Sequence, residues 1–158
     1  MSYALVFRAM SADEFRARVA ADPVVAAFRE AGGGEPTPEV ADAVVRTALE
    51  MGEEVGRTGH ASAGGDWFRE ELFDGVLAGL LGADVADHLL SRELEGIVWN
   101  DYPMVGFVPA GELAEALAKA GGDRPDDLDE DGAEVIDDVL AALRKVADAG
   151  QDVVTVYA

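Results

Sequence analysis

The stretch that decides the fold is AEVIDDVLAALRKVADAGQDVVTVY, residues 133–157. Its first part predicts an amphipathic helix over about residues 133–149, ended by Gly150, because apolar side chains recur at helical spacing and charged ones occupy the opposite face. The apolar positions are Ile136, Val139, Leu140, Leu143 and Val146. The run Asp152 to Tyr157 is β-branched with almost no polar alternation, which is typical of a central strand. We expect this strand to lie beside an N-terminal one.

The N-terminal segment supplies that second strand. The continuous apolar run Tyr3 to Met10 predicts a buried strand, and Ser11 with Glu14 has the capping-box spacing of a helix start. A capping residue followed by proline recurs at Asp22-Pro23 and Thr37-Pro38, which predicts two more helices, the second extending to about residue 56.

The middle of the chain predicts further helices and two short strands. We expect helices that begin at Asp66 and at Pro109, a small-residue loop over 57–65, and strands over 96–99 and 104–108. The fold class is therefore α+β, a single domain over 1–158 with a small mixed sheet that includes both terminal strands, packed against about six helices. Residues 123–131 form an acidic segment that we expect to be a flexible loop.

Composition excludes several classes of function. The 158 residues include no cysteine, which excludes disulfides and thiolate chemistry and favours a cytoplasmic location. The formal net charge of -20 disfavours binding to nucleic acid or to an anionic membrane surface. We see no targeting signal or membrane span. Of the 12 basic residues only Lys119 and Lys145 are lysines, an actinobacterial-type composition typical of a GC-rich genome.

Three segments carry a resemblance to a known family. They are the N-terminal strand with its Ser-x-x-Glu helix start, the helix start GFVPAGEL at 106–113, and the ending LRKVADAGQDVVTVY at 143–157. In these segments the chain resembles the YfbM-like bacterial proteins, a family of unknown function. The resemblance implies an α+β domain with both terminal strands in one sheet, and it implies no catalytic residue.

The acidic segment contains the spacing of a calcium loop. Asp127, Asp129, Asp131 and Asp138 stand at positions 1, 3, 5 and 12, with Gly132 at position 6. Glu134 occupies the usually apolar position 8, and an aspartate replaces the bidentate glutamate at position 12. The alternative is that Asp131 caps the last helix with Glu134 as its capping-box partner. We favour the alternative and expect neither a metal nor a cofactor.

Only His60 and His88 can supply imidazole chemistry. His88 follows Asp84 by four residues, which places both on one helical face without a third metal ligand. His60 lies in the glycine-flanked loop that leads to the helix start at Asp66, where an anion or a catalytic base could sit. The alternative is a loop histidine held by a structural hydrogen bond.

The segment Trp99 to Pro103 is a candidate binding surface. Trp99, Asp101 and Tyr102 cluster at an expected strand end, and with His60 they are the binding residues that we select. The alternative places Trp99 in the core and makes Asp101 a turn former.

Two functions compete on these grounds. The leading hypothesis is a noncatalytic acidic binding protein that recognises another, basic protein, in the manner of an immunity or inhibitor-like factor. The alternative is a small hydrolase or transferase that uses His60 with a nearby carboxylate, Asp66 or Asp101. A DNA mimic is a weaker third possibility. The absence of a known catalytic motif favours the first.

Overall fold

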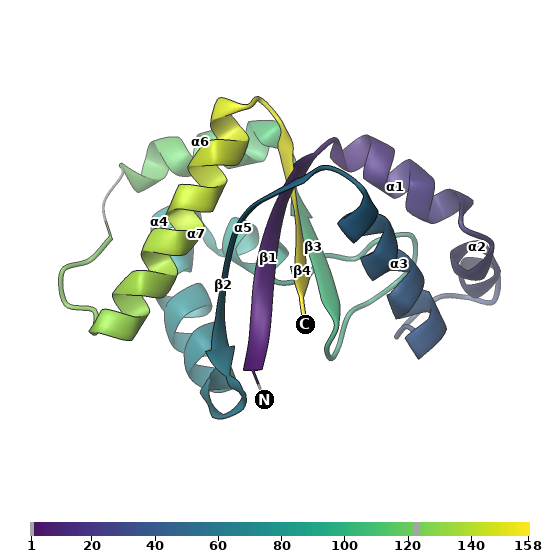
Figure 1. Ribbon diagram of the computed structural model, residues 1–158, viewed down its shortest axis with the longest axis horizontal. Helices are drawn as coiled ribbons and strands as arrows, with labels where there is room; N and C mark the ends of the chain where they lie inside the picture. Colours follow the sequence, from purple (N-terminus) through teal and green to yellow (C-terminus); the bar gives the residue numbers. More distant parts are fainter. Residues whose placement is uncertain (1, 122–123) are drawn as a thin grey trace.

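A four-stranded sheet with the order β2-β1-β4-β3 occupies the centre of the molecule (Figure 1). The computed structural model describes residues 2–121 and 124–158. The strands are β1 (Ser2–Met10), β2 (Glu53–Ala61), β3 (Met104–Val108) and β4 (Asp152–Tyr157). All three strand pairs are antiparallel, so the α+β class is confirmed while the expected mixed pairing is wrong.

The two terminal strands are the inner strands of the sheet, as the sequence predicts. β1 pairs with β4 from Leu5 opposite Tyr157 to Met10 opposite Asp152. Every β4 side chain from Val153 to Tyr157 is buried, which explains the absence of polar alternation in that run. The hydroxyl of Thr155, inside this run, donates to the carbonyl of Leu89 at 2.8 Å.

Helices flank the sheet on two sides. Figure 1 shows α1, α2 and α3 grouped on one side and α4, α6 and α7 on the other. The helical elements are α1 (Ala12–Ala21), α2 (Pro23–Glu30), α3 (Pro38–Glu50), the short 3-10 turn η1 (Ser62–Gly64), the π-helix η2 (Trp67–Leu77), α4 (Ala78–Leu81), α5 (Ala83–His88), α6 (Ala110–Ala120) and α7 (Glu130–Asp148). Within the described residues, no helix is long and apolar enough to cross a membrane.

The helix starts near the N-terminus form as the sequence predicts. The side chains of Ser11, Asp22 and Thr37 each accept a hydrogen bond from a backbone N–H in the first turn of the helix that follows. Such caps satisfy N–H groups that have no partner inside the helix. The sequence therefore locates α1, α2 and the start of α3 correctly.

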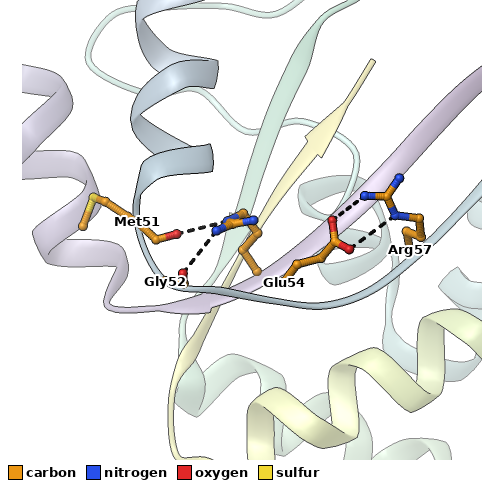
Figure 2. A network of polar contacts seen from close by, with 5 residues as sticks. Met51, Gly52, Glu54 and Arg57 are labelled. Atoms are coloured by element: carbon orange, nitrogen blue, oxygen red, sulfur yellow. Dashed lines mark hydrogen bonds and ion pairs between the residues drawn. The ribbon is translucent and has the colours of Figure 1, made fainter.

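The end of α3 and the whole of β2 differ from expectation. α3 ends at Glu50 rather than near residue 56, because Gly52, with φ +65°, turns the chain into β2. Arg8 fastens this turn, since its guanidinium donates to the carbonyls of Met51 and Gly52 at 3.0 and 3.1 Å (Figure 2). Residues 57–61 of the expected loop belong to β2, where β1 supplies the backbone pairing. The expected strand over 96–99 is reduced to isolated bridges at Ile97.

The first half of β2 lies tightly against α7. A Cβ atom on Gly56 would lie 2.8 Å from the Cβ of Ala142, so only glycine allows the helix to approach this closely. Lys145 of the same helix reaches the carbonyl of Val55, with 3.5 Å between Nζ and O. Glu54 and Arg57 form an ion pair at 2.6 Å on the exposed surface of the strand (Figure 2), and the hydrogen bond to Glu54 raises the pKa of Arg57.

Candidate functional site

A cleft of about 400 Å³ opens where β2 ends, beside the start of η2 and the first turns of α7. We call it the His60 cleft, and its volume lies in the range of ligand sites. Its lining consists of Thr58, Gly59, His60, Ala61, Gly64, Trp67, Asp131, Glu134, Val135 and Asp138. The cleft thus brings together two segments that lie far apart in the sequence, the glycine-flanked histidine and the acidic segment.

One wall of the His60 cleft carries three carboxylates from α7. Asp131, Glu134 and Asp138 are spaced three and four residues apart, which places them on one helical face. All three are exposed, and no hydrogen bond or ion pair joins them to another residue of the described chain. Asp137, by contrast, is paired with Arg124 at 2.8 Å. The wall therefore presents negative charge to the cleft.

The position of the helix cap is what turns Asp131 toward the cleft. The cap of α7 is Asp129, whose side chain accepts a hydrogen bond from the N–H of Gly132 at 2.7 Å. The expectation that Asp131 caps this helix with Glu134 as partner is therefore wrong by two residues. Both carboxylates lie inside the helix, in the turns where the helix dipole favours negative charge.

The floor of the cleft is formed by His60, which is 8 % exposed. Its Nδ1 lies 2.6 Å from the carbonyl oxygen of Ala61, and its Nε2 lies 2.5 Å from the hydroxyl of Tyr157. A carbonyl only accepts, so Nδ1 carries the proton of the neutral ring and Nε2 accepts from Tyr157. The hydroxyl of Tyr102, 3.0 Å away, then donates to that of Tyr157. The predicted structural hydrogen bond of this histidine is present twice.

Packed aromatic rings surround this row of polar groups. Phe68 lies against the His60 ring with 4.7 Å between centroids, and Tyr3 stacks on Tyr102 at 4.1 Å. Burial, followed by the hydrogen bond with Tyr102, raises the pKa of Tyr157 above its ordinary value. Like any tyrosine, Tyr157 is a neutral hydroxyl at neutral pH, and its hydrogen bond helps to hold His60 in place.

The two carboxylates proposed to assist His60 lie elsewhere. The Asp66 side chain is 87 % exposed and faces Arg69 at 3.6 Å, and it makes no capping bond to η2. The expectation that Asp66 caps this helix is therefore wrong. Asp101 accepts from the backbone N–H of Tyr102 at 2.8 Å, as a turn former does. Neither carboxylate is a hydrogen-bond partner of His60.

The expected aromatic binding segment is divided between the core and two clefts. Trp99 is buried and donates its indole N–H to the carbonyl of Arg92 at 3.0 Å. Asp101 and Tyr102 line a second cleft of about 220 Å³ beside the start of α3. Trp99 lines a third cleft of about 320 Å³. Tyr102 also joins the polar row behind His60, but it does not line the His60 cleft.

The acidic segment does not have the geometry of a calcium loop. Residues 130–138 are already helical, and Asp129 is used as a cap, so the chain does not wrap around a central point. In residues 2–121 and 124–158, no group of three or more acidic or histidine side chains could hold a metal ion. Asp123, the first residue of the acidic segment 123–131 that we expected to be a flexible loop, lies outside the described residues.

His88 and Asp84 also share a cleft, about 360 Å³ in volume, between α5 and α6. Glu112, Glu115 and Lys119 complete its polar lining. The Nδ1 atom of His88 is buried without a hydrogen-bond partner in the described chain. The expected placement of Asp84 and His88 on one face is consistent with this shared cleft.

Sequence reasoning missed Tyr3, Trp67 and Tyr157 as neighbours of His60. One signal for two of them was present, because the terminal strands were expected to pair and both carry a tyrosine near an end. The register places Tyr3 opposite His60 and Leu5 opposite Tyr157. The missing information was that His60 belongs to a strand.

No protein-family model, curated protein or solved structure matches this chain. The resemblance to the YfbM-like proteins stays a prediction.

Proposed function

We propose that this protein is a noncatalytic binding protein that recognises a basic protein partner and seats a lysine or arginine side chain of it in the His60 cleft. The observation that carries the proposal is the joint presence in one cleft of the half-buried Trp67 and of three carboxylates that pair with no other described residue. An immunity or inhibitor-like role, in which the acidic cleft covers a basic surface of the partner, is the form that we favour.

The charges favour a cationic occupant. Asp131, Glu134 and Asp138 repel one another, and a bound cation relieves that repulsion. The net charge of -20 extends the attraction beyond the cleft and accelerates encounter with a basic surface. Attraction of this kind weakens as salt screens the charges.

The nonpolar part of the cleft suits a long basic side chain. Trp67 borders the cleft on the side of η2, and Val135 lies between the carboxylates on α7. Lysine and arginine pack their alkyl stems on such surfaces and place the charged group among acceptors, while an indole ring also attracts a cation directly.

The contacts of His60 favour binding over catalysis. A general base needs a ring nitrogen that is available to substrate, and both nitrogens of His60 are engaged, by Ala61 and Tyr157. The hydrolase or transferase alternative requires His60 to give up the Tyr157 hydroxyl when substrate enters. It is the weaker proposal for that reason.

The test is capture of a partner by two triple variants with equal net charge. The cleft variant is Asp131→Asn with Glu134→Gln and Asp138→Asn; the control variant is Glu70→Gln with Glu71→Gln and Asp74→Asn, on exposed positions of η2. We expect wild type and control to retain the same basic protein at low salt and release it near 1 M salt, where the Debye length is about 3 Å. The cleft variant is expected to lose it.

Equal retention of the partner by the two triple variants would contradict the proposal. Binding would then depend on the net charge of the protein and not on the carboxylates of the cleft. Binding that is insensitive to salt would contradict it as well. Turnover of a small substrate that His60→Gln abolishes would favour the hydrolase or transferase alternative instead.

A further inference from the structure

We infer that the basic partner binds as an added β-strand, with an extended segment pairing along the outer edge of β2 at Thr58–Ala61 inside the His60 cleft. This inference rests on the proposed function and names the form in which the partner is recognised. It predicts backbone hydrogen bonds to the partner in addition to the contacts of its basic side chains.

The outer edge of β2 has no strand partner in the described chain, and on the stretch Thr58 to Ala61 the carbonyl of Ala61 already accepts a hydrogen bond from His60 Nδ1. β2 is the outermost strand of the sheet, and within the described residues no strand lies beyond it. An edge strand presents a row of N–H and C=O groups without strand partners. Four of its residues, Thr58 to Ala61, line the cleft directly. At about 3.3 Å per residue, this stretch accommodates a segment of about four residues.

The other half of the same edge is closed. Ala142 of α7 packs at Gly56, and Lys145 donates to the carbonyl of Val55. α7 thus protects the first half of β2, in the way that helices and lysines commonly protect sheet edges. Strand addition is therefore confined to the part of the edge that the cleft leaves open.

The spacing of the carboxylates suits a strand better than a compact ligand. From Asp131 to Asp138 the helix rises about 10 Å, at 1.5 Å per residue. Side chains on one face of a strand recur about every 7 Å. Basic residues at positions i and i+2 of an added strand would span about 7 Å and therefore fit within the length of the α7 wall.

The negative charge of the cleft also indicates which kind of chain can supply the added strand. A second copy that paired through the open half of its own β2 would bring a second acidic α7 wall to the same cleft, so self-pairing is disfavoured. An extended basic segment is attracted by the same wall. The occupant is accordingly a basic strand of another protein.

The test is calorimetric titration of the full chain at low salt with the peptide acetyl-Lys-Val-Lys-Val-Lys-Val-amide. Two analogues carry N-methyl groups, one on every lysine nitrogen of the backbone and the other on every valine nitrogen. N-methylation removes the N–H donors from one edge of an extended peptide and leaves the other edge intact. Because an added strand uses only one edge, we expect one analogue to bind at least tenfold more weakly and the other to bind like the parent.

Each remaining outcome is decisive. Equal affinity of both analogues and the parent would overturn strand addition and leave side-chain recognition in the cleft, and with it the proposed function, intact. Equal losses in both analogues would also overturn strand addition, since only one edge should matter. A parent peptide that does not bind, or that binds equally to the cleft triple variant, would contradict the proposed function together with this inference.

Discussion

The two halves of β2 differ in what surrounds them, although they belong to one nine-residue strand. The first half is fastened at its start by the Arg8 side chain and covered by α7 at Gly56. The second half borders an open cleft whose wall is acidic and whose floor is His60. Both halves pair with β1, so the difference lies outside the strand.

Residues in the first half of β2 therefore contribute to stability, and residues around the second half contribute to binding. Close packing at Gly56 stabilises the fold and leaves no room for a ligand. Farther along, α7 presents carboxylates that pair with no other described residue, in place of small apolar side chains, and space remains. Substitutions in the first half should therefore change stability, and substitutions on the wall of the second half should change binding.

The largest expected effect is that of Gly56→Ala. The added methyl group would overlap Ala142, and overpacking of this kind destabilises by about 1–3 kcal/mol. Chemical denaturation measures the free energy of unfolding. Gly64→Ala is the matched control, because its Cβ would lie 3.5 Å from the nearest atom, and its φ is not in the left-handed region. We expect the control to be neutral or slightly stabilising.

The double variant Gly56→Ala with Ala142→Gly sharpens this result. Removing the Ala142 methyl restores the space, at a helix-propensity cost of about 1 kcal/mol. We expect the second substitution to be less damaging in the Gly56→Ala background than in wild type. Strict additivity of the two changes would show that α7 does not pack on β2 at this point.

Tyr157→Phe should have the next largest effect. It removes the hydroxyl that partners both His60 and Tyr102, and loss of a partner for a buried polar group destabilises by about 1–3 kcal/mol. Tyr102→Phe, which keeps the bond between Tyr157 and His60, should destabilise less. The free energies of unfolding of both variants provide the comparison, and a larger loss in Tyr102→Phe would contradict the proposed role of Tyr157.

The same hydroxyl predicts a pH dependence at the alkaline end. The pKa of Tyr157 is raised in the folded chain, so the folded state keeps this proton when the unfolded chain begins to lose it near pH 10. Its contribution is fully present below that pH and declines as pH rises above it, by up to about 1.4 kcal/mol per pH unit. We expect wild type to lose stability more steeply than Tyr157→Phe above pH 10. Parallel curves would contradict this assignment.

The smallest expected effect is that of Lys145→Met, which removes the donor to the Val55 carbonyl at the protected edge. We expect a loss of about 0.5 kcal/mol together with faster amide exchange around Val55. Lys119→Met is the matched control, because it removes the other lysine, whose contact with Glu115 at 3.9 Å lies on the surface of α6. Equal exchange rates in the two variants would show that Lys145 does not protect the edge.

The sequence predicted the inner strands and most helix starts because their signals are local. The run Asp152 to Tyr157 consists almost entirely of apolar, β-branched residues, which predicts a strand that is buried on both faces. Ser11, Asp22 and Thr37 cap within three residues of themselves. Neither signal depends on knowing where the rest of the chain lies.

β2 and the His60 cleft could not be predicted from local sequence signals of this kind. The sequence EEVGRTGHA, residues 53–61, contains two glycines and two adjacent acids, so it has little strand propensity of its own, and pairing with β1 makes it a strand. Asp129 and Asp131 are both residues of a type that can cap the N-terminus of α7. In the structure Asp129 is the cap, which leaves the Asp131 carboxylate to line the cleft. His60, selected from the sequence as a candidate site residue, lines the cleft; its companions on α7 and β4 required the tertiary fold.

The most direct measurement is the change in backbone amide NMR shifts as the peptide acetyl-Lys-Val-Lys-Val-Lys-Val-amide is titrated into the full chain. A basic segment bound in the cleft should shift Thr58 to Ala61 and Asp131 to Asp138 and leave Glu53 to Arg57 unchanged. Shifts confined to other acidic surfaces, or spread equally over both halves of β2, would contradict the assignment of recognition to the open half.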